Sequence, residues 1–147
     1  MNEAIKKASE VINSRKDYIG GGMEGYAVIS LINEDGYPTA STVTISKADG
    51  INWLSFIAGT NDNKANRIRA NSKACVCLAS SKYNITLVGK AELITQPEIK
   101  KEHWQEVYSE AFGADHNDPD SCIIKFTSKS YNIFFEEGML EAKGEIQ

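Results

Sequence analysis

The sequence lacks the features that would place the protein in a membrane or an export pathway. No apolar run approaches the roughly 20 residues that a helix needs to cross a bilayer. The first residues, MNEAIKKASEV, are charged where a secretory signal has its apolar core. We therefore expect a cytoplasmic protein without membrane-spanning segments.

The sequence also contains few cysteines and has no net positive charge. The three cysteines, Cys75, Cys77 and Cys122, form an odd set. Cys75 and Cys77 lie two apart in an apparent strand, where side chains share a face but do not easily bridge. We predict buried free thiols rather than a disulfide framework. The net charge of −4 argues against a nucleic-acid-binding protein, which usually carries a basic stripe.

The chain does contain a series of short apolar segments separated by turn signals. Its 147 residues fit one domain of usual size, which we assign to residues 1–138, with a weakly ordered polar tail at 139–147. A glycine within one segment, Gly89, indicates a β-bulge. The expected strands cover residues 26–32, 39–47, 51–58, 74–80, 85–95, 122–127 and 131–135. They favour a mainly β fold, a six- to seven-stranded antiparallel barrel with peripheral helices.

Two other segments have helical spacing. Residues 3–14 repeat apolar side chains on one helical face, and Gly20–Gly22 end any regular element after it. A second long helix is expected to run to about Phe112, because Thr95-Gln96-Pro97-Glu98 matches a capping box. The acidic loop Asp115 to Asp120 lacks the spacing of a metal site, so we interpret it as a solvated turn.

The stretch Trp53 to Asn71, WLSFIAGTNDNKANRIRAN, combines the end of a strand, a polar loop and a basic helix start. Asp62 or Asn63 can cap a short helix that carries Lys64 and Arg67. Free N–H groups at such a helix start, the positive end of the helix dipole and a nearby lysine favour a phosphate or a carboxylate. An ordinary capped helix with solvated basic side chains fits the same pattern, so both interpretations stay open.

Four pieces of the chain, in this order, form a recognisable series: the turn Gly36-Tyr37-Pro38, the spacing from Lys64 to Asn71, the apolar strand Ala74 to Ser80, and Val88-Gly89 before a helix. This series resembles the pyridoxamine 5′-phosphate oxidase-like family of FMN-binding split barrels, most closely its general stress protein branch. The resemblance spans roughly Asn2 to Gly138. It implies a homodimer that binds FMN at the subunit interface, with each pocket borrowing residues from both subunits.

The resemblance also implies the residues that hold the cofactor. Lys64 would be the cation for the FMN phosphate, and the loop Gly59 to Asn63 would supply N–H donors. Ser55 and Phe56 would lie along the flavin. Asn84 would reach the flavin across the site, although a turn residue is an equally good interpretation of it. The implied cofactor-binding set is Ser41, Thr42, Ser55, Phe56, Thr60, Asn63, Lys64, Arg67 and Asn84.

The chain departs from its vitamin B6-oxidising relatives at three places. Those relatives carry an arginine and a lysine where this chain has Ser41 and Ser46, so its phosphate site is expected to be less basic or to draw Arg67 inward. They also end in a segment with arginine and histidine, and nothing after Tyr131 offers either residue. We therefore do not expect vitamin B6 oxidation.

The resemblance implies an FMN-dependent oxidoreductase whose substrate and electron donor are unknown. A flavin carries its own reactivity, which suits a chain whose two histidines, His103 and His116, are expected to be structural or solvated rather than catalytic. A flavin-storing or sensor protein in the stress response, without turnover, is the alternative of a different class. Deazaflavin or haem in place of FMN also stays open.

Overall fold

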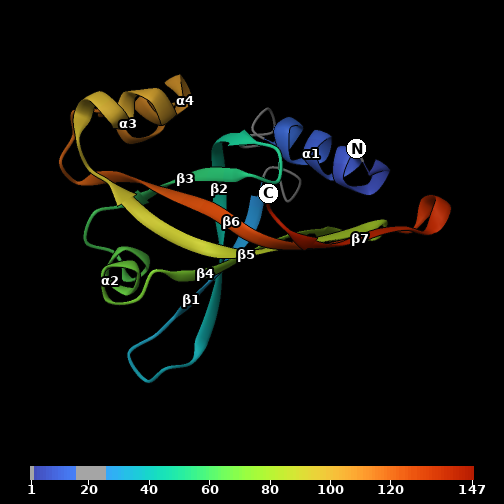
Figure 1. Cartoon of the computed structure of the whole chain (residues 1–147). Coiled ribbons are helices and arrows are strands. Elements are labelled where there is room, and N and C mark those ends of the chain that lie inside the picture. The colour runs from blue at the N-terminus through green and yellow to red at the C-terminus, as the bar shows by residue number, and fades with distance from the viewer. Residues whose placement is uncertain (1, 16–25) are drawn as a thin grey trace.

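A closed antiparallel barrel forms the centre of the molecule, as a computed structural model shows for residues 2–15 and 26–147 (Figure 1). The strand order is β3-β2-β1-β4-β5-β6-β7, and an added pairing between β3 and β6 closes the first six strands into the barrel. These six strands are β1 (Tyr26–Ile32), β2 (Pro38–Asp49), β3 (Trp53–Gly59), β4 (Lys73–Ser80), β5 (Tyr83–Ile94) and β6 (Ser121–Phe135). The predicted fold class is confirmed. The predicted glycine break at Gly20–Gly22 lies outside the described residues.

The barrel interior is filled by the inward side chains of all six strands. Ile29 on β1, Phe56 on β3 and Phe126 on β6 are each at most 1% exposed. Helix α1 (Glu3–Arg15) covers one side of the barrel, and its Ala4, Ala8 and Ile12 are fully buried. The helical spacing of the first residues therefore reflects a packing face, as predicted.

The strand β6 corrects the prediction of two separate closing strands. Its 15 residues run without interruption, because β5 pairs with it from Ile123 to Phe135. The predicted bulge is present, as a register shift between Val88 and Gly89. A Cβ atom at Gly89 would lie 2.0 Å from the backbone oxygen of Thr127. Glycine at this position therefore allows the two backbones to approach closely.

The prediction of a polar tail after residue 138 is also wrong for most of that segment. A 3-10 turn, η3 (Glu137–Met139), leads into β7 (Leu140–Glu145), which pairs antiparallel with the second half of β6. Leu140 and Ala142 pack against the core. The segment has no β-branched residue within the strand, so its extended form depends on the edge of β6 that it covers.

The predicted long helix is in fact two short helices, α3 (Pro97–His103) and α4 (Glu106–Phe112), separated by extended backbone at Trp104 and Gln105. Tertiary contacts explain the break, because the side chains of His103 and Gln105 both hydrogen bond to the barrel. The predicted capping box does not form: Gln96 occupies the cap position and makes no side-chain cap bond. No helix in the described part of the chain is long and apolar enough to cross a membrane.

Candidate functional site

The start of α2 (Asn63–Ala70) already carries its own anion. The carboxylate of Asp62 accepts the backbone N–H of Ala65 at 2.8 Å and that of Gly59 at 3.2 Å. It also lies 3.6 Å from the ammonium nitrogen of Lys64. The backbone donors that the sequence pattern offered to a ligand are therefore largely taken by Asp62. A bound anion at this end of α2 would depend on side chains instead.

Of the three cations of α2, Arg69 donates to Asn66 and to the carbonyl of Thr60. Lys64 and Arg67 remain for a ligand, and their spacing of three residues places them on one helical face. Arg67 is half-buried and donates from Nη1 to the hydroxyl of Thr39 at 3.0 Å, so it extends from the helix to β2. Its Nε is buried and has no hydrogen-bond partner among the described residues. Ser41 is exposed two residues farther along β2, on the same side as Thr39. A buried guanidinium nitrogen without an acceptor is a donor available to a ligand.

A hollow of about 260 Å³ opens at the end of β3, which residues 60–62 connect to α2. It is lined by Ile57, Ala58, Gly59 and Ser121, and Gly59 is the residue whose N–H binds Asp62. Ligand clefts usually measure about 300–1,000 Å³. The hollow of one chain is therefore small for a nucleotide-sized cofactor.

The structure places Ser55 and Phe56 away from this hollow. Phe56 is 0% exposed and points into the barrel, so its ring cannot stack on a ligand outside. Ser55 points the opposite way, and its hydroxyl lies 2.8 Å from Nδ1 of His103 beneath α3. Sequence reasoning missed Ile57 and Ala58, which line the hollow one residue farther along β3. The apolar run from Trp53 to Ala58 gives no alternation that could have separated the two sides.

Ser55, Ser46 and His103 form a buried polar cluster that attaches the helices α3 and α4 to the barrel. The hydroxyls of Ser46 and Ser55 are 2.8 Å apart, and both residues are fully buried. Burial, with a smaller contribution from the positive charge of Lys125, lowers the pKa of His103 below its usual range. A neutral, buried imidazole with a serine partner has a structural role, and Ser46 takes no part in an anion site on the surface.

The loop residues Thr60 and Asn63 differ in what they can offer. Thr60 is tied to the acidic loop, because its N–H donates to the carbonyl of Asp120 at 2.9 Å and its hydroxyl to that of Pro119 at 2.7 Å. Asn63 is exposed at the first position of α2. Of the two residues, only Asn63 has a free side chain for a ligand.

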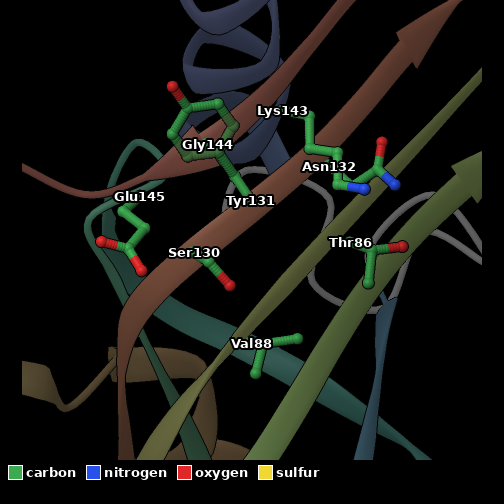
Figure 2. Close-up of a pocket in the computed structure, with 8 residues that line it drawn as sticks. All are labelled: Thr86, Val88, Ser130, Tyr131, Asn132, Lys143, Gly144 and Glu145. Carbon is green, nitrogen blue, oxygen red and sulfur yellow. The ribbon is translucent and has the colours of Figure 1, made fainter.

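A second feature is a sheet face without a single charged side chain, which we call the uncharged face. Adjacent residues in the strand registers form two rows across β2, β1, β4, β5 and β6. The rows are Thr42, Val28, Cys77, Thr86 and Asn132, and Ala40, Ser30, Cys75, Val88 and Ser130. Val28 is 36% and Val88 48% exposed. Figure 2 shows Thr86 and Val88 of β5 beside Ser130 and Asn132 of β6, with Lys143 and Glu145 of β7 at the edge.

Asn84 lies next to the uncharged face, not beside Lys64. It is the exposed second residue of β5, and its side chain contacts Thr86 and Cys77. Strand β4 separates it from α2, as Figure 1 shows. Eight residues of strand span about 26 Å. Lys64 and Asn84, both members of the implied cofactor-binding set, therefore lie far apart within one chain.

Comparisons with known proteins agree with this fold. The sequence profile of the family described as pyridoxamine 5′-phosphate oxidase like matches residues 23–138. Among curated proteins, none matches the sequence of this chain.

Solved structures with similar folds include three bacterial proteins. A protein from Clostridium acetobutylicum related to general stress protein 26 is 18% identical, with a TM-score of 0.74 over 94% of this chain and 96% of that one. A pyridoxamine 5′-phosphate oxidase-related, FMN-binding protein from Nostoc punctiforme is 14% identical, with a TM-score of 0.71 over 100% and 98%. General stress protein 26 from Bacillus anthracis is 18% identical, with a TM-score of 0.63 over 89% and 99%. At these identities the structures show a shared fold, and the match of the family profile to most of the chain shows that the protein belongs to the pyridoxamine 5′-phosphate oxidase-like family.

Proposed function

We propose that the protein is a homodimeric FMN-binding flavoprotein that works as an oxidoreductase on a substrate other than a vitamin B6 phosphate. The observation that carries the proposal is the buried Nε of Arg67, which has no acceptor within the described residues. A phosphate oxygen would supply that acceptor, and Arg67 is pre-positioned by its bond to Thr39. The FMN-binding relative from Nostoc punctiforme supports flavin as the cofactor.

The residues around Arg67 fit a phosphate monoester. Lys64 is on the same helical face, and its ammonium has only Asp62 as an ionic partner among the described residues. Ser41 and Asn63 add exposed polar side chains. Asp62 offsets part of the charge of Lys64, so we expect Arg67 to contribute at least as much to phosphate binding as Lys64 does.

The proposed dimer follows from two limits of the single chain. The hollow at the end of β3 is small for a flavin nucleotide, and Asn84 of the same chain lies at the far end of β4. A second copy docked on the uncharged face would bring its own Asn84 toward the site in a symmetric arrangement. Five strands about 4.8 Å apart and two rows about 7 Å apart give a flat area on the order of 300 Å². Other elements would add the remainder of a usual interface of about 800 Å² per partner.

When bound, the flavin supplies the electron-transfer chemistry. The protein then has to hold the cofactor and leave one side of it open to substrate. In the proposed site, Lys64 and Arg67 fix the phosphate, and Ile57 and Ala58 offer an apolar wall that excludes water from part of the cofactor. The two described histidines are not needed for this role.

The first test measures FMN affinity by quenching of flavin fluorescence. Lys64→Ala and Arg67→Ala should each weaken binding about 10- to 100-fold, because each loses a charge-assisted hydrogen bond worth about 1.5–3 kcal/mol. Arg67→Lys keeps the charge but removes Nε, so it should also weaken binding. Lys101→Ala, at an exposed cation on α3, is the matched control. Unchanged affinity in both α2 variants would refute the phosphate site.

A second test addresses the dimer and the turnover. Val28→Glu places a charge in the uncharged face, so sedimentation should show a monomer that also retains less FMN. A wild-type protein that sediments as a monomer would contradict the proposed dimer. Assays of NAD(P)H consumption with varied acceptors test the oxidoreductase role, and flavin retention without any turnover would favour storage or sensing instead.

A further inference from the structure

A second hollow, of about 700 Å³, lies where the uncharged face ends and charged side chains resume. It is formed around the bulge of β5 and β6 and is bounded by the end of β7 and by Ile146, which follows that strand. Lys73, Lys90 and Lys129 line it, together with the carboxylate residue Glu145. None of these residues belongs to the candidate flavin site, which is built on α2 and the end of β3.

Two of the lysines in this hollow place like charges side by side, which is unfavourable when no anion is bound between them. Lys73 and Lys90 are direct partners in the register of β4 and β5, and like charges directly opposite one another destabilise a sheet. The only ion pair found in the described part of the chain is Lys64 with Asp62, so neither lysine is neutralised by a carboxylate. Three ammonium groups against one carboxylate leave two positive charges at the hollow, in a protein whose net charge is −4.

A buried hydroxyl in the same hollow also lacks a partner. Ser128 is 7% exposed, and its Oγ makes no hydrogen bond with any described residue. Its backbone N–H is used, donating to the carbonyl of Asn52 at 3.0 Å. Buried polar groups are nearly always paired, so this hydroxyl indicates an acceptor or donor that a ligand would supply.

The remaining walls are apolar. Val88 is 48% exposed beside the hollow, and Ala74 and Ile146 also line it. A hollow of this size lies within the usual range for small-molecule sites, which combine apolar walls with a few polar groups. The two net positive charges would balance a dianion, and the apolar walls would contact an organic group of several carbon atoms.

We propose that this hollow binds a small organic phosphate monoester, distinct from the cofactor. The phosphate accepts hydrogen bonds from the ammonium groups of Lys73 and Lys90 and from the hydroxyl of Ser128. The organic part packs on Val88 and Ile146. The site shares no residue with the cations and the hollow proposed to hold the flavin. Val88 also belongs to the uncharged face, so in the proposed dimer this hollow lies at the edge of the interface.

The test uses phenyl phosphate as the probe and calorimetry on the full chain saturated with FMN, so that any phosphate site for the flavin is occupied. Wild-type protein should bind the probe more tightly than inorganic phosphate, and binding should weaken as salt is raised. Lys90→Gln should reduce affinity about 10-fold or more, and Ser128→Ala about 2- to 10-fold. Lys82→Gln, at an exposed lysine in the β4–β5 turn, is the matched control and should bind as wild type does.

Two further measurements separate this site from the flavin site. Lys90→Gln should bind FMN as wild type does, whereas Lys64→Ala should bind FMN more weakly and still bind phenyl phosphate. No binding of phenyl phosphate to wild type at millimolar concentration would overturn the proposal, as would equal binding to wild type and Lys90→Gln. Loss of probe binding in Lys64→Ala but not in Lys90→Gln would place the anion at α2 and would also overturn it.

Discussion

The substitution Gly89→Ala tests the contact on which the bulge of β5 and β6 depends. A Cβ atom built at Gly89 lies 2.0 Å from the oxygen and 2.9 Å from the carbon of the Thr127 carbonyl. The obstacle is backbone in the middle of a paired strand, so no side-chain rotation can relieve it. To restore even a tight contact of 3.0 Å, the two strands must separate locally by about 1 Å.

The expected loss of stability follows from that displacement. Overpacking usually costs about 1–3 kcal/mol, and two weakened ladder hydrogen bonds add about 0.5–1.5 kcal/mol each. We therefore expect a loss of about 2–6 kcal/mol in the free energy of unfolding, a large part of the roughly 5–15 kcal/mol of a typical domain. The melting temperature should fall by about 4–24 °C.

Thermal and urea unfolding followed by circular dichroism measure this loss. Gly59→Ala is the matched control, because its nearest neighbour, Cβ of Asp62, lies at an ordinary 3.7 Å. That variant should melt within about 2 °C of wild type or slightly higher. If Gly89→Ala melts as wild type does, the close approach of the two backbones is not a feature of the protein, and the reasoning fails.

Two other predictions concern the helices that cover β3 and β6. Burial lowers the pKa of His103 in the folded protein. Its neutral form therefore adds stability above the pKa of about 6.5 that a histidine has in the unfolded chain. This stability is lost as the pH falls through the lower pKa of the folded state. The melting temperature of wild type should thus decrease more between pH 7 and 5 than that of His103→Asn, and parallel pH profiles would contradict this. Lys100 is 1% exposed and donates to the carbonyls of Asp118 at 2.7 Å and Ser121 at 2.9 Å. Lys100→Met should cost about 2–4 kcal/mol and speed proteolysis in the acidic loop, and an unchanged cleavage rate there would exclude a clamping role.

Much of the barrel could be predicted from local sequence. The β-branched run Tyr26 to Ile32 is β1 with the predicted bounds, and Gly36 forms the expected turn with φ of +86°. Gly89 indicated the bulge because a glycine inside an apolar strand often marks a bulge or a close approach of two backbones. These features depend on residue type within a short window, which a sequence displays directly.

Other features depend on contacts between distant segments. The break between α3 and α4 follows from the bonds of His103 to Ser55 and of Gln105 to Ser46, which no helical periodicity contains. The strand β2 has a register shift between Ile45 and Lys47, so Ile45 and Ser46 are both buried. Two successive buried residues break the strict alternation of a strand, so the burial of Ser46 was not predictable from its position in the sequence.

The candidate site was predictable in part. The cations of α2 were predictable from their spacing, and the match of the family profile to residues 23–138 confirms the predicted family. The role of Asp62 was predictable in part. A cap residue can be recognised in a sequence, but the second hydrogen bond of Asp62, which it accepts from the N–H of Gly59, cannot. The direction of Phe56 was not predictable, since both sides of β3 are covered by protein and its residues do not alternate in polarity.

The last strand, β7, has a consequence for solubility. Its outward residues Glu141, Lys143 and Glu145 are exposed and charged, while the second half of β6 that it covers, YNIFF, is uncharged and strongly β-forming. Charge on an edge strand discourages pairing with another chain. Without β7, that half of β6 would present open N–H and C=O groups beside aromatic side chains, a template for fibrous aggregation. The charged strand thus covers an edge that would otherwise favour pairing with another chain.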